Sequence, residues 1–431
     1  MKFLINFFII LFFFNNVFAE NNLKFFIDSA FEKNLKLNAE RKNQKSIEQN
    51  LNISRSEFLP SISLSGNQSS SQSTNRSNQS GVSLSDTNLD TETKSISVDQ
   101  KIFQGFKGYN SLKKSELEVK RANTELRKTE QQTILDTVSA YFDFIFKIKN
   151  EEFNLSNVNL FERQVESDSA RLQKGEVTLT DLAQSESSLA GANANLIKAK
   201  TELLASKINL ERVTRVKVSN FINTNEKIDI NLPNTLEEAL NIARLNNSDL
   251  LVSKLDYKIA EKELNIEKAK MSPSASINYS KSENKDYSST VDELDQETLK
   301  ATITWPLIKG GENISSIKKS SLKKQRSLLL SQDAENKIVT KTTNAWSNYQ
   351  SSESVLTATE AQLKAAEIAN EGITLEYDSG NTRTTLEVIQ SRSLLLESRI
   401  AFAKAQRDLM ISKVKLSYQL GTLSLGSINA L

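Results

Sequence analysis

The side chains that carry most enzyme chemistry are absent from this sequence. None of its 431 residues is a histidine or a cysteine, which excludes imidazole and thiol catalysis, disulfide bonds and most transition-metal sites. Hydrolases that use only Asp and Glu, and enzymes with a Ser–Lys pair, remain possible by composition. No set of polar residues converges on such a site, however, so the sequence favours a function other than catalysis.

The charged and the turn-forming residues restrict the fold and the partners. Lys and Arg number 55 and Asp and Glu number 53, a net charge of +2 that gives no reason to expect a nucleic-acid partner. Gly (12) and Pro (4) are scarce, which favours a few very long elements because these residues usually end helices and strands. With 25% charged and 38% hydrophobic residues, we expect no single large compact core.

The N-terminal residues are typical of a secretory signal peptide. Lys2 precedes an apolar run over residues 3–14, and Val17 and Ala19 place small residues before a cleavage site after Ala19. An N-terminal membrane anchor is the alternative, although the run is shorter than the roughly 20 residues that a membrane-spanning helix needs. We therefore predict a signal peptide over residues 1–19, and no later segment is long and apolar enough for a transmembrane helix.

The remaining sequence repeats itself at low identity. One constant offset pairs residues of the first half with residues of the second: Thr137 with Thr342, Ala140 with Ala345, Tyr141 with Trp346, Phe144 with Tyr349, Gly105 with Gly310, and Gly175 with Gly380. A slightly larger offset pairs Asn34 with Asn247 and Pro60 with Pro273. We infer two structural repeats, 20–215 and 234–420, joined by a strand or linker over 216–233 and followed by a tail over 421–431.

Each half has the same predicted order of elements. Helices over about 23–58 and 236–271 end before Pro60 and Pro273. After a hairpin in each half, the sequence predicts very long helices over 105–174 and 311–378. Turns centred on Gly175 and Gly380 lead into second helices over 179–213 and 385–420.

The hairpins are predicted over about 61–104 and 274–307 from a period of two. Leu299, Ala301 and Ile303 alternate with polar residues, and Ile62 and Leu64 alternate with serines. The tips, about 70–92 and 281–295, are polar. The alternation is typical of membrane-barrel strands, with one face toward lipid and one toward water; a soluble hairpin at the end of a helical rod is the alternative.

A membrane barrel would need several chains. The smallest such barrels have 8 strands, whereas two hairpins supply only four; two chains would give 8 strands and three would give 12. Open sheet edges are not tolerated in lipid. The helices carry polar residues on most faces, which fits the wall of a hollow tube with water on both sides. A plain coiled-coil rod also explains the helices, but it does not explain two hairpins at equivalent places.

Four short segments resemble those of the TolC-type outer-membrane efflux family. They are Leu59-Pro60-Ser61-Ile62-Ser63, Ile102-Phe103-Gln104-Gly105-Phe106, Thr304-Trp305-Pro306-Leu307-Ile308-Lys309-Gly310-Gly311 and Leu375-Glu376-Tyr377-Asp378-Ser379-Gly380. The resemblance extends from Asn21 to about Gly426. It implies a membrane α+β fold, in which three chains form a 12-stranded outer-membrane β-barrel with four strands from each chain. The barrel would continue into a long periplasmic α-helical barrel with a mixed α/β girdle at its equator.

The resemblance also implies a function and partners. The chain is expected to be the exit duct of a tripartite efflux pump or a type I secretion system, in the outer membrane of a Gram-negative cell with a large periplasmic part. Its expected partners are two further copies, a periplasmic adaptor, an inner-membrane pump driven by protons or ATP (RND or ABC type), and outer-membrane lipid. No cofactor, metal or catalytic residue is implied. The alternative is a periplasmic coiled-coil interaction protein, either an adaptor or a surface fibre.

Residues beside the two Gly-centred turns match the gate of this family. Thr180 and Asp181 match its Thr-Asp pair, and Tyr377 and Arg383 would be their partners on the other turn. An Asp181–Arg383 bond would be directional and exchangeable, as charge-assisted hydrogen bonds are. The alternative interpretation is that Asp181 is a surface carboxylate in the first turn of a helix, where the helix dipole favours it.

Two further positions match the family's pore constriction. Glu387 and Gln390 occupy sites that are often both acidic, and a ring of three Glu387 carboxylates would favour cations; an ordinary solvated helix face is equally consistent with the sequence. Gly175 and Gly380 are expected to supply positive φ at the turns, and secondarily to form tips to which an adaptor docks. Beyond the turns, Trp305 and Tyr279 could lie at a membrane interface or pack between barrel and helices.

Overall fold

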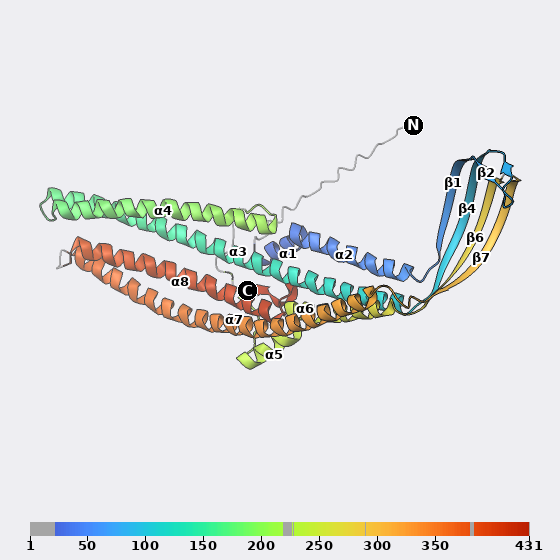
Figure 1. Ribbon diagram of the computed structural model, residues 1–431. Helices are drawn as coiled ribbons and strands as arrows, with labels where there is room; N and C mark the ends of the chain where they lie inside the picture. The colour runs from blue at the N-terminus through green and yellow to red at the C-terminus, as the bar shows by residue number, and fades with distance from the viewer. Residues whose placement is uncertain (1–21, 219–225, 227, 289, 380–382, 431) are drawn as a thin grey trace, which may run out of the picture. The chain divides into compact units, whose positions relative to one another are not determined.

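The two halves of the chain contain helices of matching lengths. The computed structural model describes residues 22–218, 226, 228–288, 290–379 and 383–430, so the predicted signal peptide lies outside the described residues. The helices are α1 (Leu23–Lys33), α2 (Leu35–Ser56), α3 (Lys107–Gln173), α4 (Leu179–Thr214), α5 (Leu236–Asn246), α6 (Ser248–Ala269), α7 (Glu312–Asp378) and α8 (Thr385–Leu420) (Figure 1). In both halves their lengths are 11, 22, 67 and 36 residues in turn. The long helices and those that follow them are therefore confirmed.

The first predicted helix of each half is in fact two helices. Asn34 separates α1 from α2, and Asn247 separates α5 from α6; both have extended backbones, with φ and ψ near −64° and 123°, and −62° and 124°. Each side-chain oxygen accepts backbone N–H groups of the next helix, from Leu37 at 3.1 Å and from Leu250 at 3.2 Å. A single helix was predicted because apolar periodicity continues through the break, whereas the asparagine side chain caps a new helix.

The strands form one four-stranded antiparallel sheet in the order β1-β4-β6-β7. Its members are β1 (Ser61–Ser73), β4 (Thr87–Gln104), β6 (Ser274–Ser288) and β7 (Val291–Thr304). Between β1 and β4 lies a small pair, β2 (Arg76–Ser77) and β3 (Ser83–Leu84). The strands continue through much of the region predicted as polar tips, because polar side chains there pair across strands, as in the Lys281–Glu297 ion pair at 3.4 Å.

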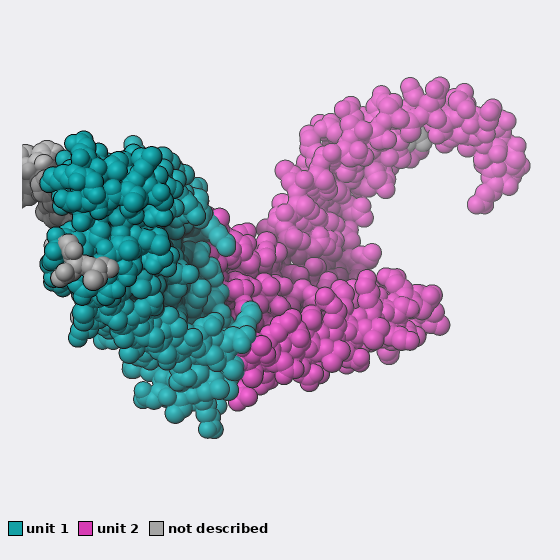
Figure 2. All heavy atoms as spheres, turned by 90° about the vertical axis from the view of Figure 1, so that its left-hand side faces the viewer, with its two compact units in different colours: residues 1–38, 130–243, 341–431 teal, residues 39–129, 244–340 magenta. Residues whose placement is uncertain are grey.

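Contacts divide the chain into two compact units (Figure 2). Unit 2 (residues 39–129 and 244–340) contains the sheet and the helical segments next to it. In this unit, ion pairs join α3 to α6: Lys114–Glu263 at 2.9 Å, Arg121–Asp256 at 2.6 Å and Lys128–Asp249 at 2.7 Å. The charged residues of these helices thus lie in helix–helix contacts as well as at the surface.

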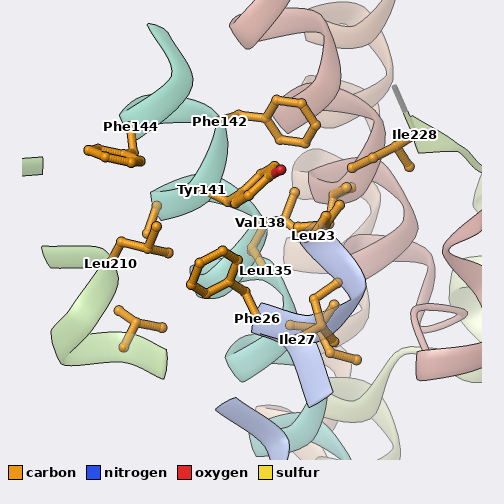
Figure 3. Close-up of a cluster of buried hydrophobic side chains, with 14 of the residues drawn as sticks. Leu23, Phe26, Ile27, Leu135, Val138, Tyr141, Phe142, Phe144, Leu210 and Ile228 are labelled. Atoms are coloured by element: carbon orange, nitrogen blue, oxygen red, sulfur yellow. The ribbon is translucent and has the colours of Figure 1, made fainter. Parts of the chain in front are cut away.

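Unit 1 (residues 1–38, 130–243 and 341–431) holds an extensive apolar cluster. Phe26 of α1 packs against Tyr141 of α3, and Leu210 of α4 lies in the same cluster (Figure 3). Buried Glu226 accepts a hydrogen bond from the Tyr141 hydroxyl. It also accepts one from the Leu23 N–H, which lies 3.0 Å from Glu226 Oε2. These bonds fix the start of α1 against α3.

The predicted linker contributes a strand to a small sheet in unit 1. β5 (Ile228–Asp229) pairs antiparallel with β8 (Asn429–Ala430), after a short 3₁₀ helix over Leu425–Ser427. The linker between the two halves is thereby joined to the C-terminal tail. Among the described residues, no helix is long and apolar enough to cross a membrane.

Candidate gate at the two helix turns

The turn between α3 and α4 is built on a glycine. Gly175 has a φ of +74°, and a Cβ at this position would meet no atom within 4 Å, so the backbone angle rather than space selects glycine. The N–H groups of Gly175 and Glu176 close the end of α3 on the carbonyls of Leu172 and Arg171, at 3.0 and 2.9 Å. Gly380, its predicted counterpart, lies outside the described residues.

Asp181 belongs to a capping box at the start of α4. Its Oδ2 accepts hydrogen bonds from the Thr178 hydroxyl at 2.7 Å and from the Thr178 N–H at 2.8 Å. In return the Asp181 N–H donates to Thr178 Oγ1 at 3.2 Å. The hydrogen bonds from Thr178 hold the pKa of the Asp181 carboxyl below its ordinary value. Thr180, the other predicted gate residue of this turn, is exposed.

Glu387 occupies the same position in the second turn. Its Oε2 accepts from the Thr384 N–H at 2.8 Å, and the Glu387 N–H donates to Thr384 Oγ1 at 3.3 Å. The backbone of Thr384, followed by the side chain of Arg383, lowers the pKa of Glu387. The sequence assigned Asp181 to a gate and Glu387 to a constriction, yet both are the third helical residue of equivalent capping boxes. Gln390 lies one turn later on α8 and is exposed.

Arg383 is held by two carboxylates of its own turn. Its Nε is 2.6 Å from Glu376 Oε2, and its guanidinium is 2.9 Å from Glu387 Oε1. Within one chain, therefore, the structure places Arg383 between α7 and α8, and Asp181 in its capping box with Thr178. The side chains of Arg383, Glu376 and Glu387 are each more than a third exposed, so their ion pairs contribute little to stability and are open to exchange.

Tyr377, the fourth predicted gate residue, is buried in a polar cluster. Its hydroxyl donates to Asp168 Oδ1 at 2.8 Å and lies 3.1 Å from Thr385 Oγ1. Asp168 also accepts from the Ser185 hydroxyl at 2.5 Å and from the Gln164 amide at 2.9 Å. We call Gln164, Asp168, Ser185, Tyr377 and Thr385 the Asp168 cluster; it joins α3, α4, α7 and α8.

The cluster fits a charged carboxylate. Asp168 is fully buried, and its described partners are hydrogen-bond donors, as an ionised carboxylate requires. Two cations lie nearby: the Arg171 guanidinium stacks 4.6 Å from the Tyr377 ring centre, and the half-buried Arg392 interacts electrostatically with Asp378 and Asp168. Burial lowers the pKa of Arg392, and these carboxylates oppose that shift. The site therefore compensates a buried charge that would otherwise be costly.

Asp168 was missed from the sequence, although a signal for it exists. Val158 and Phe161 mark a buried stripe of α3, and Gln164 and Asp168 continue it at helical spacing. Polar residues in such a stripe need buried partners. The sequence did not show which helix would supply them, because Tyr377 belongs to the other half of the chain.

Similar sequences and a similar fold occur in other proteins. A sequence model for the family described as outer membrane efflux protein matches residues 26–214 and 239–422. Outer membrane efflux protein BepC of Brucella suis is 24% identical over 400 residues, which cover 92% of this chain and 84% of BepC. Outer membrane protein TolC of Vibrio cholerae is 25% identical over 381 residues, covering 86% and 84% of the two chains. The CmeC outer membrane channel of Campylobacter jejuni has a similar fold, with a TM-score of 0.81 at 16% identity over 94% of this chain and 86% of CmeC.

Proposed function

This chain belongs to the outer membrane efflux protein family, and on that premise we propose how three copies form and close the duct. The family is one of channels rather than enzymes, and the chain serves as an outer-membrane exit duct for efflux. The alternative of an adaptor or surface fibre is wrong, because the family match covers both halves of the chain. We retain the repeat boundaries 20–215 and 234–420 as part of the proposal.

The sheet supports a trimer. β1 and β7 each pair on one side only within the four-stranded sheet, and open edges are not tolerated in lipid. Joining β7 of one copy to β1 of the next closes a barrel, and three copies give 12 strands. The test is a disulfide across this junction in a chain without native cysteines. Paired cysteines in β1 and β7 should yield cross-linked trimers, whereas the same cysteines placed in β4 and β6 should cross-link only within one chain.

The helix turns support a gate at the periplasmic end. The Asp168 cluster connects α3, α4, α7 and α8, so the two helix pairs of one chain cannot separate without breaking its bonds. Arg383 forms ion pairs with Glu376 and Glu387. It can exchange these partners for the carboxylate of Asp181, which follows Thr180 in the other turn. In this proposal Tyr377 holds the helices of one chain together, and Arg383 switches carboxylate partners as the gate opens.

Conductance of the reconstituted channel tests the gate. Tyr377→Phe removes one hydroxyl and keeps the ring on which Arg171 stacks, so we expect a higher conductance without loss of the trimer. Asp181→Ala and Arg383→Ala should also raise conductance. Arg399→Ala is the matched control, because Arg399 pairs with Glu367 between α7 and α8 at 3.5 Å, away from the turn. Equal conductance in all four variants and the wild type would contradict the gate.

We also propose that three Glu387 carboxylates, one from each copy, form a ring that favours cations at the pore constriction. Gln390 lies one turn further along α8. Glu387→Gln suits the test because glutamine also completes a capping box, so the charge is removed while the cap remains. The ratio of cation to anion permeability should fall in this variant and stay unchanged in Gln390→Ala. An unchanged permeability ratio in Glu387→Gln would contradict the proposed carboxylate ring.

The turns also present a surface for a periplasmic adaptor that links the duct to an inner-membrane pump. Open space around Gly175 leaves the tip of the α3–α4 turn unobstructed, and we assign Gly380 the same role. Affinity purification of the native protein with mass spectrometry should recover an adaptor and a pump of the proton-driven or ATP-driven class. Recovery should fall when Gly175 is replaced by a bulky residue and persist with a substitution in residues 78–82, the loop between β2 and β3.

A further inference from the structure

The two faces of the β-sheet differ in exposure along the inner strand β6. Along β6 the residues Ile277, Tyr279, Lys281, Glu283 and Lys285 are exposed, whereas Asn278, Ser280, Ser282 and Asn284 are less exposed. The strands bend visibly along their length (Figure 1). Side chains on the concave side of a bent sheet converge and shield one another, so the exposed set lies on the convex face. In a closed barrel the convex face is the outer one.

The part of the convex face nearest the helices is mostly apolar, with Gln100 as an exception in the row of Ile277 and Ala301. The strand register places Ile62, Val98, Tyr279 and Leu299 in one row across the sheet. Ala301 and Ile303 continue this face along β7, and Trp305, Leu307 and Ile308 extend it past the strand's end, all three more than 60% exposed. From Leu299 to Ile308 this band is about ten residues long, the length that a tilted transmembrane strand needs.

The same face becomes charged on β6 and β7 within one row, while β1 and β4 still carry the apolar Leu64 and Ile96 in that row. On β6 Tyr279 is followed on the convex face by Lys281, and on β7 Leu299 is preceded by Glu297; these two charged residues form an ion pair at 3.4 Å. The next rows toward the tip remain charged, and Glu92 pairs with Lys94 at 2.8 Å. We call this set the charged collar; it comprises Glu92, Lys94, Lys281, Glu283, Lys285, Glu293, Asp295 and Glu297.

The concave face shows no such change. Ser63, Ser97, Ser280 and Thr298 form one row on it, and Ser65, Ser95, Ser282 and Gln296 form the next, with serine hydroxyls of β1 and β4 2.7 Å apart in both rows. These rows lie beside both the last apolar row and the first charged row of the convex face. The switch from apolar to charged therefore belongs to the outer face alone, and it reflects a change in the medium outside the sheet.

We propose that the hydrocarbon of the outer membrane ends at the row of Leu64, Ile96, Lys281 and Glu297, where apolar and charged residues meet. The charged collar then stands in the lipid headgroup layer and the water beyond it. Only the half of the sheet next to the helices then crosses the hydrocarbon. Trp305, whose ring N–H donates to the Met271 carbonyl at 3.2 Å, lies toward the inner edge of the band, and Tyr279 lies at its outer edge. Strands of 13 to 18 residues exceed the length that lipid requires, and the collar accounts for the excess.

This inference rests on the proposed barrel, and the test separates the two. Single cysteines at Ala301, Asp295 and Thr302 are introduced into the cysteine-free chain, labelled with a fluorophore, and reconstituted as SDS-resistant trimers. Fluorescence is quenched from the lipid by brominated acyl chains and from the water by iodide. The ratio of lipid to water quenching should be several-fold higher at Ala301 than at Asp295. Thr302, at the depth of Ala301 but on the concave face, should be quenched by iodide.

The outcomes that overturn the inference are distinct. Equal lipid quenching at Asp295 and Ala301 would place the collar inside the hydrocarbon and refute the boundary, while iodide quenching at Thr302 would leave the barrel standing. Lipid quenching at Thr302 would refute the barrel and the boundary together. A further cysteine at Glu297 should give an intermediate ratio, and a ratio there equal to that of Ala301 would also move the boundary and contradict the proposal.

Discussion

The two helix turns of this chain share a capping box and differ in the position of their arginine. Both turns start a 36-residue helix with a threonine and an acidic residue in a capping box, Thr178 with Asp181 and Thr384 with Glu387. In the first turn Arg171 comes from the preceding helix, pairs with Glu176 and stacks on Tyr377. In the second, Arg383 lies beside the cap itself and joins Glu376 to Glu387. The repeat therefore fixes the turn geometry, whereas the placement of the arginine gives the second turn an exchangeable ion pair.

The largest expected effect comes from the cluster that joins both turns. Asp168→Ala leaves the hydroxyls of Ser185 and Tyr377 without their acceptor in a buried site, which should lower the free energy of unfolding by about 2–4 kcal/mol. Denaturant unfolding of the purified protein measures this. Asp143→Ala is the control, since Asp143 is a partly exposed carboxylate of α3 that pairs with Arg407 at 2.9 Å. Similar losses in both variants would show that the cluster does not hold the turns together.

The capping boxes test whether the two turns are equivalent. Thr178→Ala and Thr384→Ala each remove a helix N-cap and should cost about 1 kcal/mol. The comparison predicts similar changes in unfolding midpoint for the two variants, with Thr178→Ser and Thr384→Ser close to wild type. A loss confined to one turn would break the equivalence.

The arginines test where the turns differ. Arg383→Ala should raise the conductance of the reconstituted channel more than Arg171→Ala, because only Arg383 bridges the two carboxylates beside the second cap. Arg383→Lys keeps the charge but not the fork of donors and should give an intermediate value. A larger effect of Arg171→Ala would assign the switching role to the first turn.

The smallest expected effect is a dependence on pH that the two turns share. The pKa values of Asp181 and Glu387 are lowered in the folded chain, so each carboxylate stabilises its turn above its unfolded pKa. That contribution is lost as the pH falls from the unfolded pKa through the lowered folded pKa. Asp181→Asn and Glu387→Gln should each flatten the acid limb of a stability profile slightly. A profile identical to wild type in both variants would show that the caps do not titrate as described.

Sequence periodicity predicted most elements because they are long and regular. The ends of α3 and α7 lie within two residues of the predicted ends, since Gly-centred turns interrupt an otherwise unbroken helical pattern. Asn34 and Asn247 were paired as equivalent residues, yet their role as helix breaks was missed. An asparagine within a helical pattern is ordinary, and only its extended backbone shows that it caps a new helix.

The candidate site was predicted less completely. Tyr377 and Arg383 were identified, but the partner of the Tyr377 hydroxyl is Asp168, a residue to which the sequence gave no role. Periodicity shows which stripe of a helix is buried, but not which residue of a distant helix faces it. That pairing depends on how α3 and α7 are rotated against each other, which is a property of the packed fold.

The measurement that tests the central claim most directly is native mass spectrometry of the detergent-solubilised protein. A closed barrel requires the open edges of three four-stranded sheets to pair with one another. We therefore predict a single species with three times the mass of one mature chain. A chain that stays monomeric, in detergent or without it, would contradict the account.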